Sequence, residues 1–223
     1  MNTLILSSII TLFLYTLDRV SQYLYVHIGP GDLVVPHNAR WFFIHSLANS
    51  AVAVLGSSDL LYCSRNMNTC VMDEWTYFSW VTFLVAFITH VYHVIFFWDK
   101  LSRDEWIHHG VMVGVATPLT LCFPTKTSIV ALCFLTGYPG MIDYFFLWCV
   151  KMSWMSRELQ HVYSALINVW IRSPGCLFAS FLTIPILNYE FGNSIIPISL
   201  ALLSFWNGQY YMVKAVDSNR LHW

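Results

Sequence analysis

The chain has 223 residues, of which 57% are hydrophobic and 10% are charged, and its mean hydropathy is +0.57. Soluble domains carry about 25% charged residues, so the composition excludes an ordinary soluble domain and indicates an integral membrane protein. The formal net charge of −1 gives no electrostatic reason to expect a nucleic-acid partner.

Seven segments approach the roughly 20 apolar residues that a membrane-spanning helix needs. In chain order they are about Leu4–His27, Trp41–Tyr62, Trp75–Trp98, Ile107–Phe123, Ser128–Val150, Ser164–Leu187 and Ser194–Val213. The fourth segment is short, so six spans and one segment lying in the membrane interface are an alternative. The predicted fold class is all-α, a multi-pass transmembrane bundle of about seven helices. Because no basic stretch or small-residue cleavage pattern opens the chain, we expect the first segment to remain as a helix.

The distribution of Lys and Arg predicts the orientation of this bundle, because cytoplasmic loops are enriched in these residues. With seven helices, two basic residues fall at one face, Arg65 and Lys126. Seven fall at the other face: Arg40, Lys100, Arg103, Lys151, Arg157, Lys214 and Arg220. The C-terminus is therefore predicted to be cytoplasmic. Cys63 and Cys70 then face the oxidising side, where either a disulfide bond or two free thiols would fit.

Ionisable residues within the predicted spans indicate a polar interior, since such groups usually face the inside of a bundle. They are Asp18, Arg19, Asp59, Asp143 and Arg172. Asp143 and Arg172 are also expected near breaks in their helices, at Tyr138-Pro139-Gly140 and Ser173-Pro174-Gly175. Irregular backbone at membrane depth is tolerated where it lines a cavity. A structural pairing of Asp143 with Arg172 is the alternative.

Histidines are concentrated at one place in the sequence. His90 and His93 share a helix face, and His108 and His109 follow after a short turn that makes the two helices antiparallel neighbours. We predict a polar pocket that opens to the cytoplasm, in which a neutral imidazole acts as a general base. The alternative is a set of interfacial histidines bonded to the backbone or to lipid headgroups.

The same four histidines are enough in number for one transition metal. The remaining histidines, at positions 27, 37, 45, 161 and 222, are scattered and build no HxxxH or HxxHH box of the kind found in membrane di-iron enzymes. We therefore expect no metal site.

Five stretches occur in the order ARWFFIHSLANS, RDEWIHHGVMV, TGYPGMIDYFFLWCVKM, INVWIRSPG and SFWNGQYYMV. Together they resemble the TLC domain, a membrane module shared by translocation-associated membrane proteins and ceramide synthases. The resemblance divides the chain into a first transmembrane helix and loop (1–38), a TLC-like domain (39–216) and a short C-terminal tail (217–223).

The resemblance implies that His108 and His109 are catalytic and that Asp143 is the acidic residue downstream of them. His90, His93, Asp143 and Arg172 are the candidate substrate-binding residues. Ceramide synthases have an acidic cluster where this chain has Gly140-Met141-Ile142-Asp143-Tyr144. The chain is thus more similar to the small stand-alone TLC proteins of lipid metabolism and homeostasis.

The functional expectation is acyl transfer from acyl-CoA, as co-substrate, to a lipid amine, with no resident cofactor. The alternative is a non-catalytic protein that binds or senses membrane lipids in the same cavity. The resemblance implies that the protein resides in the endoplasmic reticulum or another endomembrane rather than in the plasma membrane.

Overall fold

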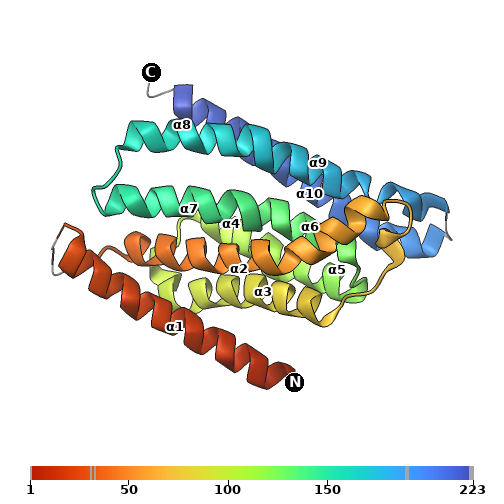
Figure 1. The fold of residues 1–223 in the computed structure, drawn as a ribbon, viewed down its shortest axis with the longest axis horizontal. Helices are drawn as coiled ribbons and strands as arrows, with labels where there is room; N and C mark the ends of the chain where they lie inside the picture. Colours follow the sequence, from red (N-terminus) through yellow and green to blue (C-terminus); the bar gives the residue numbers. More distant parts are fainter. Residues whose placement is uncertain (1, 31, 33, 189–190, 221–223) are drawn as a thin grey trace.

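The computed structural model describes residues 2–30, 32, 34–188 and 191–220, and they form seven helices, the number of the preferred sequence prediction. These helices run roughly along one axis, with α1 at one side and α8 to α10 at the other (Figure 1). Within these ranges the only strand-like pairing is an isolated bridge between Glu74 and Thr125.

Four helices are continuous and three contain a π-helical turn. The continuous ones are α1 (Thr3–Ile28), α2 (His37–Arg65), α3 (Tyr77–Phe97) and α10 (Phe191–Arg220). The other three are α4 (Arg103–Val111) with α5 (Thr117–Cys122), α6 (Lys126–Leu132) with α7 (Tyr138–Lys151), and α8 (Arg157–Ile167) with α9 (Ser173–Phe181). Short 3₁₀ turns lie at Cys70–Met72, Trp98–Lys100 and Ile184–Asn188.

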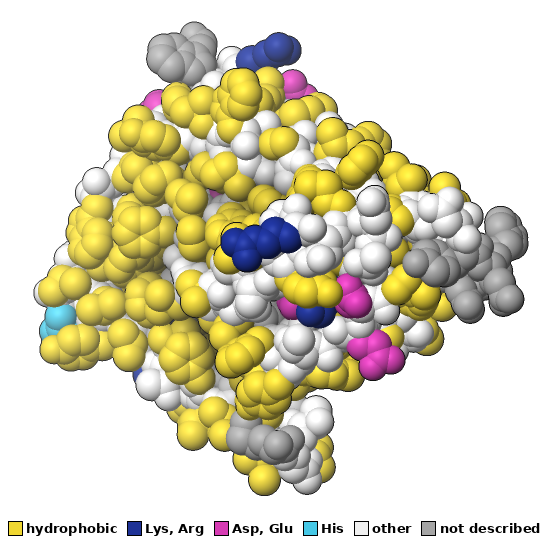
Figure 2. Space-filling view, turned by 45° about the vertical axis from the view of Figure 1, so that its right-hand side comes forward, with side chains coloured by type: hydrophobic (Ala, Val, Ile, Leu, Met, Phe, Trp, Pro, Cys, Tyr) yellow, Lys and Arg dark blue, Asp and Glu magenta, His cyan; other side chains and the backbone are white. Residues whose placement is uncertain are grey.

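Within the described part of the chain, four helices are long and apolar enough to cross a membrane: Thr3–Ile28, Tyr77–Lys100, Lys126–Lys151 and Arg157–Asn188. Hydrophobic side chains cover most of the face shown in Figure 2, and few charged groups interrupt them. Such a surface is expected where the surroundings are not water.

Helix α2 is the central element of the bundle, packed against α1, α3, α6 and α7 (Figure 1). It carries Ser46, Asn49 and Asp59, all of them buried. Their partners lie on neighbouring helices: Ser46 donates to the Met141 carbonyl, and Ser79 donates to Asp59. Because its surroundings are protein on several sides, α2 can be less apolar than the outer helices.

The three π-helical turns each end two residues before a proline. The turns are Met112–Ala116, Cys133–Gly137 and Asn168–Arg172, and the prolines are Pro118, Pro139 and Pro174. A proline lacks the N–H for the helical hydrogen bond and crowds the preceding turn, and the wider turn makes room for it. The predicted breaks at Tyr138-Pro139-Gly140 and Ser173-Pro174-Gly175 are therefore wrong in form, because the helices continue through them.

Two helices begin earlier than hydropathy predicted, because side chains cap them. Ser102 and Glu105 form a reciprocal capping box at the start of α4. Ser156 caps α8, so the polar residues 157–161 belong to the helix rather than to a loop. α10 likewise continues through 217–220, which the sequence assigned to the tail, while residues 221–223 lie outside the described part.

Helix α1 is fixed to α2 by a buried ion pair. Asp18 is 1% exposed and accepts a hydrogen bond of 2.6 Å from Nε of Arg40, with a second from Nη2. The adjacent Arg19 instead lies over Tyr15 and contacts Gln22. The charge inside the first helix is thus neutralised from the second.

Candidate functional site

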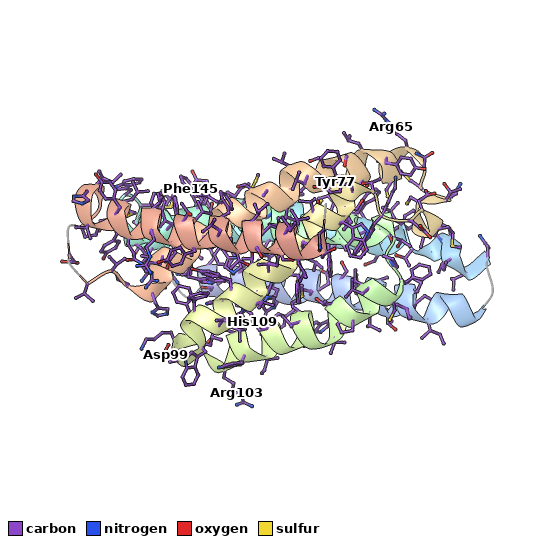
Figure 3. All side chains as sticks on the ribbon, turned by 90° about the horizontal axis from the view of Figure 1, so that it is seen from below. Arg65, Tyr77, Asp99, Arg103, His109 and Phe145 are labelled. Atoms are coloured by element: carbon purple, nitrogen blue, oxygen red, sulfur yellow. The ribbon has the colours of Figure 1, made fainter. Side chains whose placement is uncertain are left out.

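A cavity of about 300 Å³ lies inside the bundle. Helices α2, α3, α4, α7 and α10 line it. The turns Met112–Ala116, Cys133–Gly137 and Asn168–Arg172 all reach its wall. We call it the histidine chamber, because His45, His90, His93, His108 and His109 line it. In Figure 3, His109 points into the bundle, whereas Arg65 and Arg103 project from its surface.

The structure brings the two histidine pairs of α3 and α4 together. His90 Nε2 lies 3.3 Å from His108 Nε2, and His93 Nδ1 lies 3.2 Å from His109 Nε2. His90, His93 and His109 are almost fully buried, at 5%, 2% and 4% exposed. Each imidazole of one helix therefore has its partner on the other helix.

Two backbone carbonyls determine the direction of these contacts. His90 Nδ1 is 2.7 Å from the Ala86 carbonyl, and His109 Nδ1 is 2.6 Å from the Glu105 carbonyl. A carbonyl only accepts, so both Nδ1 atoms carry the proton, and in the neutral ring both Nε2 atoms carry a lone pair. His108 Nε2 must then donate to His90, and His93 Nδ1 must donate to His109.

The remaining nitrogens of His93 and His108 differ. His108 Nδ1 is left as an acceptor for the Tyr211 hydroxyl, at 3.5 Å. His93 Nε2 is left with a lone pair and has no hydrogen-bond donor among the residues that the structure describes. His93 also stacks on Trp41, with ring centroids 3.2 Å apart. The free lone pair of this neutral network therefore belongs to His93.

His45 is a chamber residue that the sequence does not predict, because it is one of the histidines that belong to no sequence motif. It is 5% exposed, stacks on Tyr144 with centroids 4.4 Å apart, and its Nδ1 has no hydrogen-bond partner. A single histidine in α2 has no local spacing signal. Only the packing of α2 between α3 and α7 brings it to the chamber.

Asp143 does not line the chamber, which contradicts its predicted place beside the histidines. Its carboxylate accepts hydrogen bonds from Gln160 Nε2 at 3.1 Å and from Ser164 Oγ at 3.2 Å. Both donors are on α8, so Asp143 joins α7 to α8. The described residues show no ion pair between Asp143 and Arg172, so the alternative of a direct pair is not observed either.

Arg172 does line the chamber, from the last position of its π-helical turn. It is 8% exposed, and its guanidinium lies over the ring of Tyr211, 5.0 Å from the centroid. Its Nε is buried and has no hydrogen-bond partner within the described part of the chain.

An apolar cavity of about 90 Å³ lies beside the chamber along α10, and the two share Met112, Leu135 and Asn207 in their walls. Leu132, Leu200 and Leu203 line this second cavity, which we call the apolar arm. Beyond Leu200 lies a small hollow bounded by Thr183 and Pro197. The site thus combines a polar chamber with an apolar extension.

The other end of the chamber opens between α4 and α10. Lys214 and Asp104 form an exposed ion pair of 3.1 Å there. A further cavity of about 160 Å³ runs along this seam, past His108 and Tyr210. Lys214 is one of the seven basic residues that predict the cytoplasmic side, so the opening lies at that end of the bundle.

The described side chains of the chamber are not arranged as a metal site. Among the residues that the structure describes, no group of three or more His, Cys, Asp or Glu side chains is arranged to hold a metal ion. The closest imidazole nitrogens face one another, 3.2 and 3.3 Å apart, rather than a shared point.

No protein-family model matches this chain, and no curated protein and no solved structure shows significant similarity to it. The geometry of the chamber and the apolar arm therefore carries the functional proposal.

Proposed function

We propose that the protein is an integral membrane protein of lipid metabolism, built around a TLC-like domain, that transfers an acyl group from acyl-CoA to a lipid amine. The observation that carries the proposal is that a histidine-lined chamber lies beside an apolar arm and shares three wall residues with it, Met112, Leu135 and Asn207. This combination suits an amphiphile, whose reactive polar end would lie among imidazoles while its alkyl chain occupies the arm. An endomembrane location with a cytoplasmic C-terminus gives acyl-CoA access to the open end.

The positions of the ring protons suggest a chemical role for each histidine. His93 Nε2 is the free lone pair, so it would take the proton from the attacking amine. The positive charge that forms on His93 is stabilised because its Nδ1–H is bonded to His109 Nε2. His109 acts as the orienting residue, because its own bond to the Glu105 carbonyl fixes its tautomer. His108 would turn its Nε2–H away from His90 and donate it to the developing oxyanion. When the C–S bond of acyl-CoA breaks, the His93 imidazolium would return its proton to the departing coenzyme A thiolate.

A non-catalytic lipid-binding or lipid-sensing role is the second candidate, and one observation favours it. Both ring nitrogens of His108 and of His109 already have hydrogen-bond partners. A fully satisfied network of this kind is also what a purely structural polar core requires.

Mass spectrometry of cellular lipids separates the two roles. Cells would express the wild type, His108→Ala/His109→Ala, His93→Ala, or the control His27→Ala, which changes an exposed histidine outside the chamber. If the protein transfers acyl groups, the wild type and the control should change the acyl-chain profile of the cellular lipids relative to cells without the protein. The chamber variants should leave that profile unchanged. A profile that changes equally with all four proteins contradicts the enzymatic role and supports binding.

A further inference from the structure

Arg172 is the one cation inside the histidine chamber that has no described ion-pair or hydrogen-bond partner. No carboxylate oxygen of the described residues lies within 4.0 Å of its guanidinium nitrogens, and its Nε has no hydrogen-bond partner among those residues. A buried charge is expensive unless it is paired and hydrogen-bonded. The ring of Tyr211 supports one face of the guanidinium but offers no acceptor in its plane.

The nearby described carboxylates have other hydrogen-bond partners, and none of them forms an ion pair with Arg172. Asp104 is paired with Lys214 at the opening. Glu105 is held by the backbone N–H and hydroxyl of Ser102, at 2.7 and 2.6 Å. Asp143 is bonded to Gln160 and Ser164 outside the chamber wall. The histidines, neutral in the arrangement derived above, add no negative charge.

We propose that Arg172 is an anion-binding residue that receives a carboxylate or phosphate oxygen group of a ligand whose alkyl chain lies in the apolar arm. A guanidinium presents its N–H groups as a planar fork that matches both anions. The Nε–H of Arg172 is available for one bond of that fork. This inference rests on the proposed function, because it names the anionic group of the acyl-chain ligand that the chamber accepts besides the lipid amine.

The arm fixes the direction in which such a ligand would lie. Arg172 and Tyr211 belong to the chamber, whereas Leu200 and Leu203 belong to the arm, and Asn207 lines both. An amphiphile with its anionic end at Arg172 therefore has its chain pointing toward Leu200. The anion itself has two sources, the carboxyl group of a fatty acid or the phosphates of coenzyme A.

Binding of two probes with the same chain and opposite charge tests the inference. Purified full-length protein in detergent would be titrated with radiolabelled hexadecanoate and with hexadecylamine. We expect the wild type to bind the carboxylate at least about tenfold more tightly than the amine, a difference of about 1.4 kcal/mol. Arg172→Gln should remove this preference and Arg172→Lys should retain part of it. Arg65→Gln, an exposed arginine at the far end of α2, should leave it unchanged.

Competition in the wild type needs no variant and identifies the source of the anion. If free coenzyme A displaces hexadecanoate, its phosphate oxygens bind at Arg172. If hexadecanoate stays bound in excess coenzyme A, its carboxylate binds at Arg172. Equal binding of hexadecanoate and hexadecylamine to the wild type would overturn the anion site while leaving the lipid-binding proposal intact. If neither amphiphile binds, the proposed function fails as well.

Discussion

The Ala86 and Glu105 carbonyls fix which nitrogen carries the proton in four histidines. These carbonyls lie one helical turn before His90 and His109, so each helix orients its own imidazole. The partner imidazole on the other helix then has no choice of tautomer. Direction in this network therefore comes from backbone geometry rather than from a charged side chain.

Asp143→Asn should lower stability without affecting the chamber. The asparagine would place an amide N–H₂ where Gln160 or Ser164 now donates to a carboxylate oxygen. A buried donor that loses its acceptor costs about 1–3 kcal/mol. We expect a lower melting temperature in detergent than for the wild type, with hexadecanoate binding changed by less than about twofold.

Asp99→Asn is the control for this change, because Asp99 is exposed and forms its ion pair with Lys100 at the surface. It should leave the melting temperature close to that of the wild type. Weaker hexadecanoate binding by Asp143→Asn at unchanged stability would instead return Asp143 to the binding site.

Residue by residue, the sequence predicted four of the five histidines that line the chamber, together with Arg172, but not the rest of its wall. His90, His93, His108 and His109 could be found because a short turn forces their helices to be antiparallel neighbours. His45 and Tyr211 could not be found, because only long-range packing brings α2 and α10 to the chamber. Asp143 was misplaced because a carboxylate in an apolar helix can be satisfied on either side of it, and nothing local reveals that Gln160 and Ser164 are its donors.

At the scale of elements, the π-helical turns are what bring distant side chains to one chamber. Met112, Thr136 and Arg172 all lie in such turns, one from each of the three proline-containing helices. Hydropathy identified these helices but cannot show how a proline is accommodated. The local choice between a break and a wider turn depends on whether neighbouring helices hold the segment straight.

The apolar arm should measure the length of the alkyl chain. From Asn207 to Pro197 the α10 face spans about 15 Å at 1.5 Å per residue, half of the ~30 Å hydrocarbon thickness of a bilayer. Leu200 separates the arm from the hollow at Thr183 and Pro197. Leu200→Ala should therefore lengthen the chains of co-purifying lipids, and Ala131→Phe, which fills the arm, should shorten them.

Mass spectrometry of lipids extracted from each purified variant gives the chain lengths. Leu202→Ala is the matched control, because Leu202 is 63% exposed on the outer face of α10. A misfolded variant would lose lipid but would not select longer chains. The same chain-length distribution in Leu200→Ala, Ala131→Phe and the wild type contradicts the assignment of the arm.

For the whole molecule, the helix order collects the basic residues at the end of the bundle where the chamber opens. Arg40 lies in the first turn of α2, Lys151 ends α7, Arg157 begins α8 and Lys214 lies near the end of α10. Arg65 lies at the opposite end from Asp99 and Arg103 (Figure 3). The seven-helix count and this polarity both followed from the sequence, because hydropathy and charge are properties of segments rather than of contacts.

The C-terminus should therefore be digested by protease added to the cytoplasmic side of sealed vesicles. A tag placed after the last residue reports the cleavage, and a lumenal protein of the same vesicles serves as the control for sealing. Protection of the tag until detergent is added would reverse the orientation, and the chamber would then open away from the cytoplasm.

Cys63 and Cys70 test the same orientation independently. In the structure both are free, buried thiols. On the oxidising side they should lose two electrons to the oxidants of that compartment and form a disulfide, which would contribute about 2–3 kcal/mol for so short a loop. Maleimide labelling under denaturing, non-reducing conditions should then miss both cysteines, and full labelling of both would exclude the bond.

The ion pair between Asp18 and Arg40 ties the biogenesis of the protein to the order of its synthesis. α1 emerges from the ribosome with its aspartate unpaired, and at the centre of a lone helix in the bilayer that side chain costs roughly 2.5–3.5 kcal/mol. Arg40 follows only 22 residues later. The first helix should therefore wait at the insertion machinery until the second has been made, and the two should enter the lipid together as a hairpin.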